Sequence, residues 1–386
     1  MNNNPTDLLE YKEKMEIKGK IDQYYKSQEM KNGLESLKRI KSYLPDTYKG
    51  LYIMRNIVFA HLDFGPILEL AAEGREFTVV SGLNPSSPLH LGHKVLFDIL
   101  LFLQSLGGRI FIPITNDESF VDGKTKSLSE SRRIAYQEII PSIIAFGFDP
   151  EKTHIFVDSD YPDLYNFAIH LSNKFSLPEV TTVFGENSLN TPGQIFYRSA
   201  VQMSQILMPQ LPEFGGPKPV LIPVGVDQHP YILLARDTAK KMKLVPSSEL
   251  VFKFLPSLRN PENKMSGSKP ETAIYLTDTP DVIRHKIDKA YTGSLSSLTA
   301  HRKLGAIPEI CSVFSLFFFH HPDKNLVSRI YRRYKSGKMT TSELKEIVKE
   351  FITNIILDHQ DKKKNITANN INSFLLKKPL RSFLEY

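Results

Sequence analysis

The sequence predicts an α/β fold in which a parallel sheet is interrupted by a helical insertion and followed by an all-helical region. Short β-branched runs alternate with amphipathic stretches of about 15 residues, as in βαβ units. A helix-patterned stretch separates the last strand-like run from the others, and helical patterns alone follow residue 281. The composition, with 41% hydrophobic and 24% charged residues in 386 positions, is that of a globular chain with a sizeable core.

Three predicted strands form the first part of the sheet. They span 77–81, 109–114 and 153–157, with helical patterns over 91–106 and 130–146 between them. Crossover connections of this kind are right-handed, and open parallel sheets bind ligands at the carboxyl ends of their strands. We therefore expect a Rossmann-type, nucleotide-binding sheet.

The segments on either side of these strands are predicted to be helical. Residues 1–50 are polar and lysine-rich with weak helical periodicity, and 63–74 read as a helix closed by a glycine. Residues 160–212 read as mostly helical, with a Gly- and Asn-rich break over 185–193. The sheet is then expected to resume with a buried strand over 219–224.

After a helix over 228–242, the strongest helical pattern covers 340–361. There, Thr340 and Glu343 form a capping box. Three lysines, 362–364, follow and are either a helix cap or phosphate contacts. Apolar residues at helical spacing predict that one face of this helix is core; they are Leu344, Ile347, Val348, Phe351, Ile352, Ile355 and Ile356.

Cysteine content and hydropathy exclude several classes of protein. The single cysteine, Cys311, excludes a disulfide framework and a multi-cysteine zinc site, and no metal centre is expected. The first 20 residues contain no apolar signal segment, and no window approaches the ~18 consecutive apolar residues of a membrane span. We therefore expect a cytoplasmic protein without a membrane partner.

Positive charge is concentrated near the C-terminus. The formal net charge is +7, and residues 301–386 carry 16 Lys and Arg against 8 Asp and Glu, whereas residues 1–300 carry 33 against 34. A polyanion such as nucleic acid would explain this excess. A lysine-rich solvated surface would explain it equally well, so charge alone does not decide.

The segment SGLNPSSPLHLGH (81–93) follows the first predicted strand of the sheet and opens a helix. It places His90 and His93 on one face of the first helical turn, where free N–H groups also attract anions. Gly92 leaves room for a flat ring or a phosphate to approach. The histidines could donate hydrogen bonds to charge that develops on phosphate oxygens. Two chance helix caps are the alternative, but the strand before and the helix after favour a functional site.

A second candidate segment is the hydroxyl-rich, doubly basic loop KMSGSKP (264–270). A mobile lysine can follow charge as it builds on departing pyrophosphate, and serines can hold phosphate oxygens. Closure of such a loop commits a bound substrate to reaction. Taken alone, this loop would be interpreted as a basic surface loop. Because it occurs together with the histidine-containing segment, a phosphate-binding site is favoured instead.

The common phosphate-loop, dinucleotide and hydrolase motifs are absent, whereas these two segments match a known family. HLGH (90–93) and KMSGS (264–268) resemble the two hallmark motifs of class I aminoacyl-tRNA synthetases. Within that class, the chain resembles the tryptophanyl-tRNA synthetases of the archaeal and eukaryotic type over about residues 50–365. The stretches that carry this closer likeness are 55–68, GVDQHPY (225–231), KMSGSKPETAIYLTDTP (264–280) and HRKLG (301–305).

The resemblance implies a two-step tryptophan–tRNA ligase reaction without a covalent enzyme intermediate. The amino-acid carboxylate attacks the α-phosphate of ATP, which gives an aminoacyl-adenylate and pyrophosphate, and the terminal ribose of tRNA then takes the acyl group. ATP, arriving with Mg²⁺, is the implied co-substrate, and the rate comes from positioning and charge stabilisation. The implied partners are a tryptophan-specific tRNA and a second copy of the chain in a homodimer.

Site residues are implied position by position from the family motifs. The implied catalytic residues are His90, His93, Lys264, Ser266 and Ser268. The residues implied to bind ATP are Gly82, Gly92, Gly225, Asp227 and Lys269. The residues implied to face the amino acid are Glu118, Gln202, Gln205, Gln228 and Tyr231. Gln202 and Gln228 match pocket glutamines of the family. For each of them taken alone, a structural role as a hydrogen-bonded interior amide is as good an interpretation as a role in substrate binding.

The sequence departs from the family pattern at several positions. Gly267 stands where many class I enzymes carry a second lysine, and Leu83-Asn84 replace Arg-Gly. Val80 and Pro113 stand where family members have a tyrosine and a glutamine that read the indole N–H. A buried polar group without a partner costs ~1–3 kcal/mol, so either another group reads the N–H or the amino acid differs. The candidates for that group are Gln202, Gln205 and Tyr231.

The predicted domain organisation has five parts. They are an N-terminal helical extension (1–75), the first half of the Rossmann catalytic domain (76–160), a helical connecting insertion (161–215), the second half of the catalytic domain (216–283) and a helical anticodon-binding domain (284–386). Three alternatives stay open: a tyrosine–tRNA ligase, a synthetase-like adenylating enzyme that does not act on tRNA, and an RNA-binding paralogue without activity.

Overall fold

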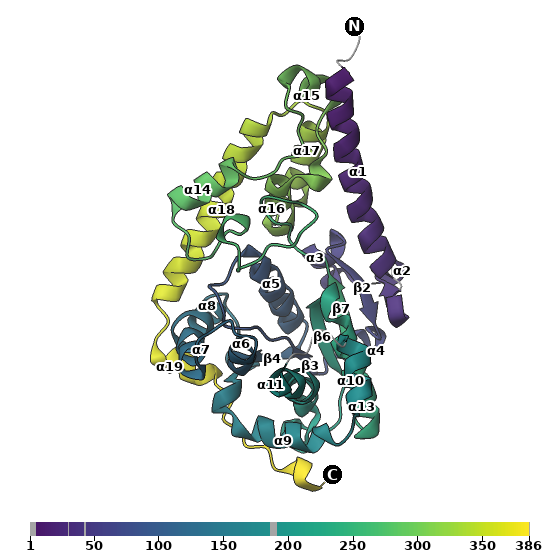
Figure 1. The fold of residues 1–386 in the computed structure, drawn as a ribbon, viewed down its shortest axis with the longest axis vertical. Helices are drawn as coiled ribbons and strands as arrows, with labels where there is room; N and C mark the ends of the chain where they lie inside the picture. The colour runs from purple at the N-terminus through teal and green to yellow at the C-terminus, as the bar shows by residue number, and fades with distance from the viewer. Residues whose placement is uncertain (1–4, 30, 42–43, 186–190, 386) are drawn as a thin grey trace. The chain divides into compact units, whose positions relative to one another are not determined.

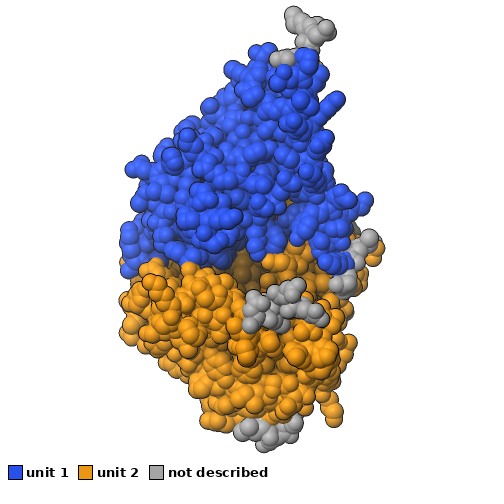
Figure 2. All heavy atoms as spheres, viewed as in Figure 1, with its two compact units in different colours: residues 1–32, 87–95, 253–364 blue, residues 33–86, 96–252, 365–386 orange. Residues whose placement is uncertain are grey.

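The computed structural model describes residues 5–29, 31–41, 44–185 and 191–385, which form two compact units (Figure 2). Unit 1 comprises residues 1–32, 87–95 and 253–364. Unit 2 comprises residues 33–86, 96–252 and 365–386. Each unit is therefore assembled from segments that are far apart in the sequence.

A seven-stranded sheet is the centre of unit 2, with the strand order β1-β2-β7-β6-β3-β4-β5. Five of these strands, β2, β7, β6, β3 and β4, are labelled in Figure 1. Its strands are β1 (Glu35–Ser36), β2 (Val58–Leu62), β3 (Phe77–Val80), β4 (Gly108–Ile114), β5 (Thr153–Val157), β6 (Val220–Gly225) and β7 (Ser248–Phe252). The last five in the order are parallel, whereas β1 and β2 are antiparallel additions at one edge. The order of the parallel strands reverses between β3 and β6, which is the switch point where open α/β sheets bind ligands.

The predicted parallel α/β sheet is confirmed, and the four predicted strands are β3, β4, β5 and β6. Strands β1, β2 and β7 were not predicted. β2 and β7 each contain a buried polar side chain, His61 and Glu249 respectively, which interrupts the apolar run that indicates a strand. The expectation of helices alone over residues 1–50 is wrong at β1, which pairs with β2.

Helices surround this sheet, and the predicted helical insertion lies between β5 and β6. The helices of unit 2 are α2 (Lys38–Lys41), α3 (Leu51–Met54), α4 (Gly65–Ala72), α6 (Asn116–Val121), α7 (Leu128–Ile134), α8 (Ile140–Ile144), α9 (Pro162–Ser172), α10 (Leu177–Phe184), α11 (Pro192–Phe196), α12 (Gln202–Leu207), α13 (His229–Lys241), α19 (Ala368–Phe374) and most of α5 (Leu91–Ser105). Side chains of β3, β4 and β5 share one apolar core with α9, α12 and α13. Of the predicted break over 185–193, residues 186–190 lie outside the described residues.

Two single π turns interrupt helices of unit 2. The turn Ala135–Ile139 divides the helix predicted over 130–146 into α7 and α8. Pro141, near the start of α8, has no N–H to continue the regular ladder. The second turn, Tyr197–Val201, leads directly into Gln202 at the start of α12. Such turns re-aim the side chains that follow them and are frequent at functional sites.

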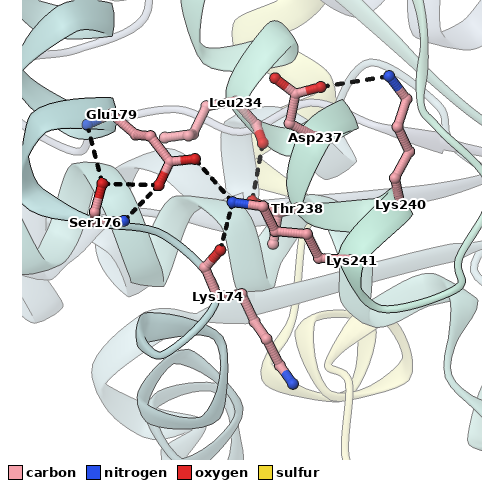
Figure 3. Close-up of polar contacts among 8 residues, drawn as sticks. All are labelled: Lys174, Ser176, Glu179, Leu234, Asp237, Thr238, Lys240 and Lys241. Carbon is pink, nitrogen blue, oxygen red and sulfur yellow. Dashed lines mark hydrogen bonds and ion pairs between the residues drawn. The ribbon is translucent and has the colours of Figure 1, made fainter.

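Lys241 links the insertion helix α10 to α13 through hydrogen bonds (Figure 3). Ser176 and Glu179 form a capping box at the start of α10. The Nζ atom of Lys241, at the end of α13, donates to Glu179 Oε1 at 2.8 Å and to the carbonyl of Lys174 at 2.7 Å. The insertion is thus connected to the helix that follows the sheet strand β6.

Unit 1 is helical. Its helices are α1 (Pro5–Gln28), α14 (Pro280–Asp288), α15 (Leu298–Leu304), α16 (Ser312–His320), α17 (Lys324–Lys335) and α18 (Thr341–Lys364). The predicted capping box is confirmed, since Thr340 N–H donates to Glu343 Oε2 at 2.6 Å and Glu343 N–H donates to Thr340 Oγ1 at 3.3 Å. The predicted core face of α18 is also confirmed: its residues 344, 348, 352 and 356 are fully buried.

The two ends of the lysine run 362–364 form ion pairs within α18. Lys362 pairs with Asp358 at 2.7 Å and Lys364 pairs with Asp361 at 2.9 Å. The chain then returns to unit 2, where Leu376 N–H donates to the carbonyl of Ile155 at 2.8 Å. This C-terminal tail, residues 365–385, covers the outer strand β5, as proteins commonly cover a sheet edge. In the described part of the chain, no helix is long and apolar enough to cross a membrane.

Candidate active site

His90 and His93 lie side by side in unit 1, with ring centroids 3.9 Å apart. Gly92 N–H donates to His90 Nδ1, and His90 N–H donates to His93 Nδ1, each at 3.1 Å. A neutral imidazole that accepts at Nδ1 carries its proton on Nε2. The two backbone hydrogen bonds therefore set both rings as Nε2–H donors.

The surroundings keep both rings neutral. Burial, and then the charges of His93 and Lys264, lower the pKa of His90 to about 2. Burial and the charge of Lys264 lower the pKa of His93 to about 4. The ammonium of Lys264 therefore acts on both rings, which are uncharged hydrogen-bond donors at neutral pH.

Backbone pairing joins the histidine segment (residues 87–95) to the chain after the lysine loop (residues 264–270). Leu91 N–H donates to the carbonyl of Ile274 at 3.0 Å, and Leu276 N–H donates to the carbonyl of Leu89 at 2.8 Å. Between these two bonds, the hydroxyl of Tyr275 donates to the carbonyl of Gly267 at 2.7 Å. The two segments predicted from the sequence are thus brought together within one unit.

Close packing explains the glycines in these two segments. A Cβ at Gly92 would lie 2.8 Å from Cε1 of His90, so the missing side chain lets the His90 ring pack against the backbone there. A Cβ at Gly267 would overlap Oγ of Ser87. The departure from the family's second lysine at this position therefore has a steric reason, because any side chain there would displace the histidine segment.

The lysine loop presents its polar groups at the surface of unit 1. The side chains of Lys264, Ser268 and Lys269 are exposed, and Ser266 is half-buried. The hydroxyls of Ser266 and Ser268 are 3.0 Å apart, and Met265 is buried beneath the loop. Two hydroxyls and a lysine can therefore approach one anionic group together.

Glu118, in unit 2, is held by two donors at the carboxyl end of β4. Thr115 Oγ1 donates to Glu118 Oε2 at 2.7 Å, and Asn84 Nδ2 donates to the same oxygen at 3.0 Å. The hydroxyl of Ser119 donates to Asn84 Oδ1. Asn84, which departs from the family pattern, is therefore a direct partner of the predicted acidic site residue.

Next to Glu118 lies a buried pair of carboxyl groups that sequence reasoning missed. Tyr165 hydroxyl donates to Asp117 Oδ2 at 2.9 Å, and Gln205 Nε2 donates to Asp158 Oδ2 at 2.5 Å. Burial raises the pKa of Asp117, and burial together with the charge of Asp117 raises the pKa of Asp158 well above its usual range. The raised pKa values predict that these two facing buried carboxyls share one proton.

The sequence contained a signal for this pair. Asp158 directly follows β5, and Asp117 lies three residues after the end of β4. The carboxyl ends of neighbouring parallel strands meet at the same edge of a sheet, so polar residues just after two such strands are expected to be close. Gln205, one of the predicted substrate-facing residues, lies in this network on α12.

Other predicted residues lie on unit 2 around the switch point. Ser81 hydroxyl donates to the carbonyl of Pro223 at 3.0 Å and joins the ends of β3 and β6. Gly82 packs on Pro113, so that a Cβ at Gly82 would lie 2.7 Å from that proline, and Gly225 is the last residue of β6. Asp227 is exposed, whereas Gln228 and Gln202, the first residue of α12, are half-buried. The ring centroid of Tyr231 lies 4.5 Å from that of Phe184.

A buried pair supports the turn after β6. His229 Nδ1 lies 2.7 Å from Glu249 Oε2, and both side chains are buried. The pair connects β7 to the start of α13, directly after Asp227 and Gln228. A parallel sheet with a switch point, in unit 2, and paired histidine donors next to a lysine loop, in unit 1, are each typical of a nucleotide-binding α/β enzyme.

Comparison with known proteins identifies the family to which this nucleotide-binding α/β enzyme belongs. The family model "tRNA synthetases class I (W and Y)" matches residues 72–356. The chain is 37% identical over 320 residues to the tryptophan–tRNA ligase of Methanocaldococcus jannaschii, covering 81% of this chain and 85% of that protein. It is 38% identical over 328 residues to that of Thermococcus kodakarensis, covering 84% and 82%. Its fold is similar to the crystal structure of tryptophanyl-tRNA synthetase from Aeropyrum pernix, with a TM-score of 0.83, 31% identity, and coverage of 92% and 97%. The chain therefore belongs to the class I tRNA synthetases of the tryptophan and tyrosine family.

Proposed function

We propose that this chain is a tryptophan–tRNA ligase. It activates L-tryptophan with ATP to tryptophanyl-adenylate and pyrophosphate, and then transfers tryptophan to the 3′ end of its tRNA. The observation that carries the proposal is the pair of neutral Nε2–H donors next to the lysine loop in unit 1. The names of the archaeal relatives support the choice of amino acid.

The phosphate chemistry is proposed for unit 1. His90 and His93 donate Nε2–H hydrogen bonds to phosphate oxygens as negative charge moves onto pyrophosphate. Neutral donors suit this task because they stay in place without carrying a proton away. Lys264 stabilises the departing pyrophosphate, with Ser266 and Ser268 as further donors.

The residues proposed to bind ATP are found in both units. Gly92 and Lys269 belong to unit 1, and Gly82, Gly225 and Asp227 belong to unit 2. The described residues contain no group of three His, Cys, Asp or Glu side chains that could hold a metal ion. Mg²⁺ is proposed to arrive with the triphosphate, as the resemblance to the family implies.

The amino-acid side of the reaction is proposed for unit 2. Glu118 and the proton-sharing pair of Asp117 and Asp158 give this region negative charge, which suits an α-ammonium group. The substrate-facing candidates beside Glu118 are Gln202, Gln205, Gln228 and Tyr231. Gln202, Gln205 or Tyr231 is proposed to read the indole N–H, since Val80 and Pro113 are buried in the sheet and offer no side-chain acceptor.

The test is ATP–pyrophosphate exchange measured with each of the twenty amino acids. Exchange driven by tryptophan, at least a hundredfold better than by tyrosine, is expected. Exchange with tyrosine and not tryptophan would replace the proposal with a tyrosine–tRNA ligase, the other member of the matched family. No exchange with any amino acid, together with tight tRNA binding, would leave an RNA-binding paralogue.

The proposed macromolecular partners are tRNA and a second copy of this chain. Residues 284–386 are proposed to bind the anticodon region, and their excess of basic residues supports this role. A homodimer in the cytoplasm is proposed from the resemblance to the family. Sedimentation of the full chain tests the dimer directly.

A further inference from the structure

The ammonium of Lys264 lies over an aromatic ring of its own unit. Lys264 Nζ is 5.1 Å from the ring centroid of Phe254. A cation within about 6 Å of an aromatic face is attracted by the quadrupole of the ring. Phe254 is half-buried and Lys264 is exposed, so the ammonium contacts a partly enclosed ring and stays accessible to solvent.

Phe254 and Lys264 belong to the two sides of one short backbone pairing. Lys264 forms an antiparallel bridge with Pro256. Met265 N–H donates to the carbonyl of Leu255 at 2.9 Å. Residues 254–256 and 264–265 thus form a short two-stranded arm that carries both the ring and the lysine. The position of residues 254–256 determines where the ammonium lies.

Helix α1 fastens the side of the arm that carries the ring. Phe254 N–H donates to the hydroxyl oxygen of Tyr25 at 3.2 Å, and Lys253 Nζ lies 5.3 Å from the centroid of the Tyr25 ring. Burial raises the pKa of Tyr25, so its phenol stays neutral. Helix α1 precedes the residues that the family model matches, yet it contacts the arm of the lysine loop.

We propose that Phe254, held in place by Tyr25 of α1, is a positioning residue that keeps the ammonium of Lys264 beside the histidine pair before ATP binds. The charge of Lys264 in this resting place already acts on both His90 and His93. The inference rests on the proposed function, because it takes Lys264 as the group that meets pyrophosphate. Its consequence is that the N-terminal helix contributes to the rate of adenylation.

The kinetic test compares Phe254→Leu with Phe254→Trp in ATP–pyrophosphate exchange. Leucine fills the site without a ring face, so kcat falls about three- to tenfold while KM for tryptophan stays within about twofold. Tryptophan restores the ring face and brings kcat back to within about twofold of the parent. A merely structural role would not distinguish an aromatic from an aliphatic replacement in this way. Tyr25→Phe, which removes the acceptor oxygen, lowers kcat by a smaller factor.

A control removes a lysine–phenylalanine contact in unit 2. Lys378 Nζ lies 5.8 Å from the ring centroid of half-buried Phe214, so Phe214→Leu loses a cation–π contact away from the lysine loop. It is expected to leave exchange unchanged. Equal kcat in Phe254→Leu and the parent, or no difference between the leucine and tryptophan variants, overturns the proposal.

A second readout does not depend on activity. Lysines are labelled by reductive ¹³C-dimethylation, and the signal of Lys264 is assigned by its loss in Lys264→Arg. The methyl signal is expected upfield in the parent and in Phe254→Trp, and at the shift of a solvated lysine in Phe254→Leu. A solvated shift in the parent overturns the inference. A parent that shows the upfield signal but exchanges with no amino acid overturns the proposed function instead.

Discussion

Hydrogen bonds at Nδ1 decide what His90 and His93 can do. Because each ring accepts a backbone N–H at Nδ1, its single proton is on Nε2. The low pKa values then prevent a second proton from binding at neutral pH. The pair is consequently suited to stabilising charge by hydrogen bonding and unsuited to acting as a general acid.

The neutral histidines predict acid sensitivity of the fold. An unfolded histidine has a pKa near 6.5, whereas the pKa of folded His93 is about 4. Between these values the unfolded chain binds a proton that the folded chain does not. The free energy of unfolding therefore falls as pH decreases below 6.5, by about 1–2 kcal/mol at pH 5 for this residue. Urea unfolding at pH 7 and pH 5 measures the slope, which should be smaller in His93→Asn. Identical slopes would contradict the prediction.

Lys264→Ala should lower the rate of adenylation at least tenfold, because the ammonium that stabilises pyrophosphate is removed. The side chain is exposed, so the free energy of unfolding should change little. Pre-steady-state formation of adenylate checks the rate, and urea unfolding checks the fold. A near-normal rate would remove this lysine from the mechanism.

The buried carboxyl pair predicts opposite outcomes for two substitutions of Asp158. Asparagine resembles a protonated aspartic acid, since it can donate to Asp117 and accept from Gln205. Asp158→Asn is therefore expected within about 1 kcal/mol of the parent in urea unfolding at pH 7, whereas Asp158→Ala loses about 2 kcal/mol or more. Greater loss in the asparagine variant than in the alanine variant would show that Asp158 is ionised.

At the scale of elements, local patterns were more informative than isolated residues. The strands β3 to β6 and the helix α18 were predictable because uninterrupted apolar runs or a regular stripe define them. Strand β7 was not predictable, because Glu249, its second residue, interrupts the apolar run and is compensated by His229 from another element. Likewise, the π turn at Ala135–Ile139 depends on one proline within an otherwise helical pattern.

The same distinction applies to the candidate site. The histidine segment and the lysine loop are each contiguous in sequence, so their residue types were visible without a structure. The pair of Asp117 and Asp158 and the contact between Tyr25 and Phe254 join residues that are far apart in the chain. Periodicity carries no information about such pairs, since they depend on how the elements pack.

The capping box of α18 predicts a measurable loss of stability at the element scale. Thr340→Ala removes the hydroxyl that accepts from Glu343 N–H, and it should cost about 1 kcal/mol in urea unfolding. Ser342→Ala, an exposed position two residues later, is the matched control and should cost much less. Equal losses in the two variants would contradict a capping role.

At the scale of the whole molecule, the basic excess is divided between the two units. Residues 301–364, in unit 1, carry 13 Lys and Arg against 7 Asp and Glu, and residues 365–386, in unit 2, carry 3 against 1. Most of the charge available to a polyanion is therefore on the helices of unit 1. Removing residues 301–386 would dismantle both units, so charge substitution in the full chain is the appropriate test.

Reversing three exposed charges at and just after α17, Arg329, Arg333 and Lys338, should weaken tRNA binding and make it less sensitive to salt. Fewer phosphate contacts release fewer counterions, so the slope of log affinity against log salt should become shallower by about 2. Reversing Lys12 and Lys20, exposed on α1, is the comparison and should have a smaller effect. Binding measured from 50 to 300 mM salt gives both slopes, and equal slopes would locate the tRNA surface elsewhere.

The tail that covers β5 has a consequence for how the chain is made. During synthesis on the ribosome, all seven strands emerge before residue 376, which donates to the carbonyl of Ile155. The outer strand of the nascent sheet therefore stays open for the time needed to translate more than a hundred residues. During that interval the nascent chain is most prone to aggregate through its unpaired edge strand. A chaperone that binds the edge would prevent this.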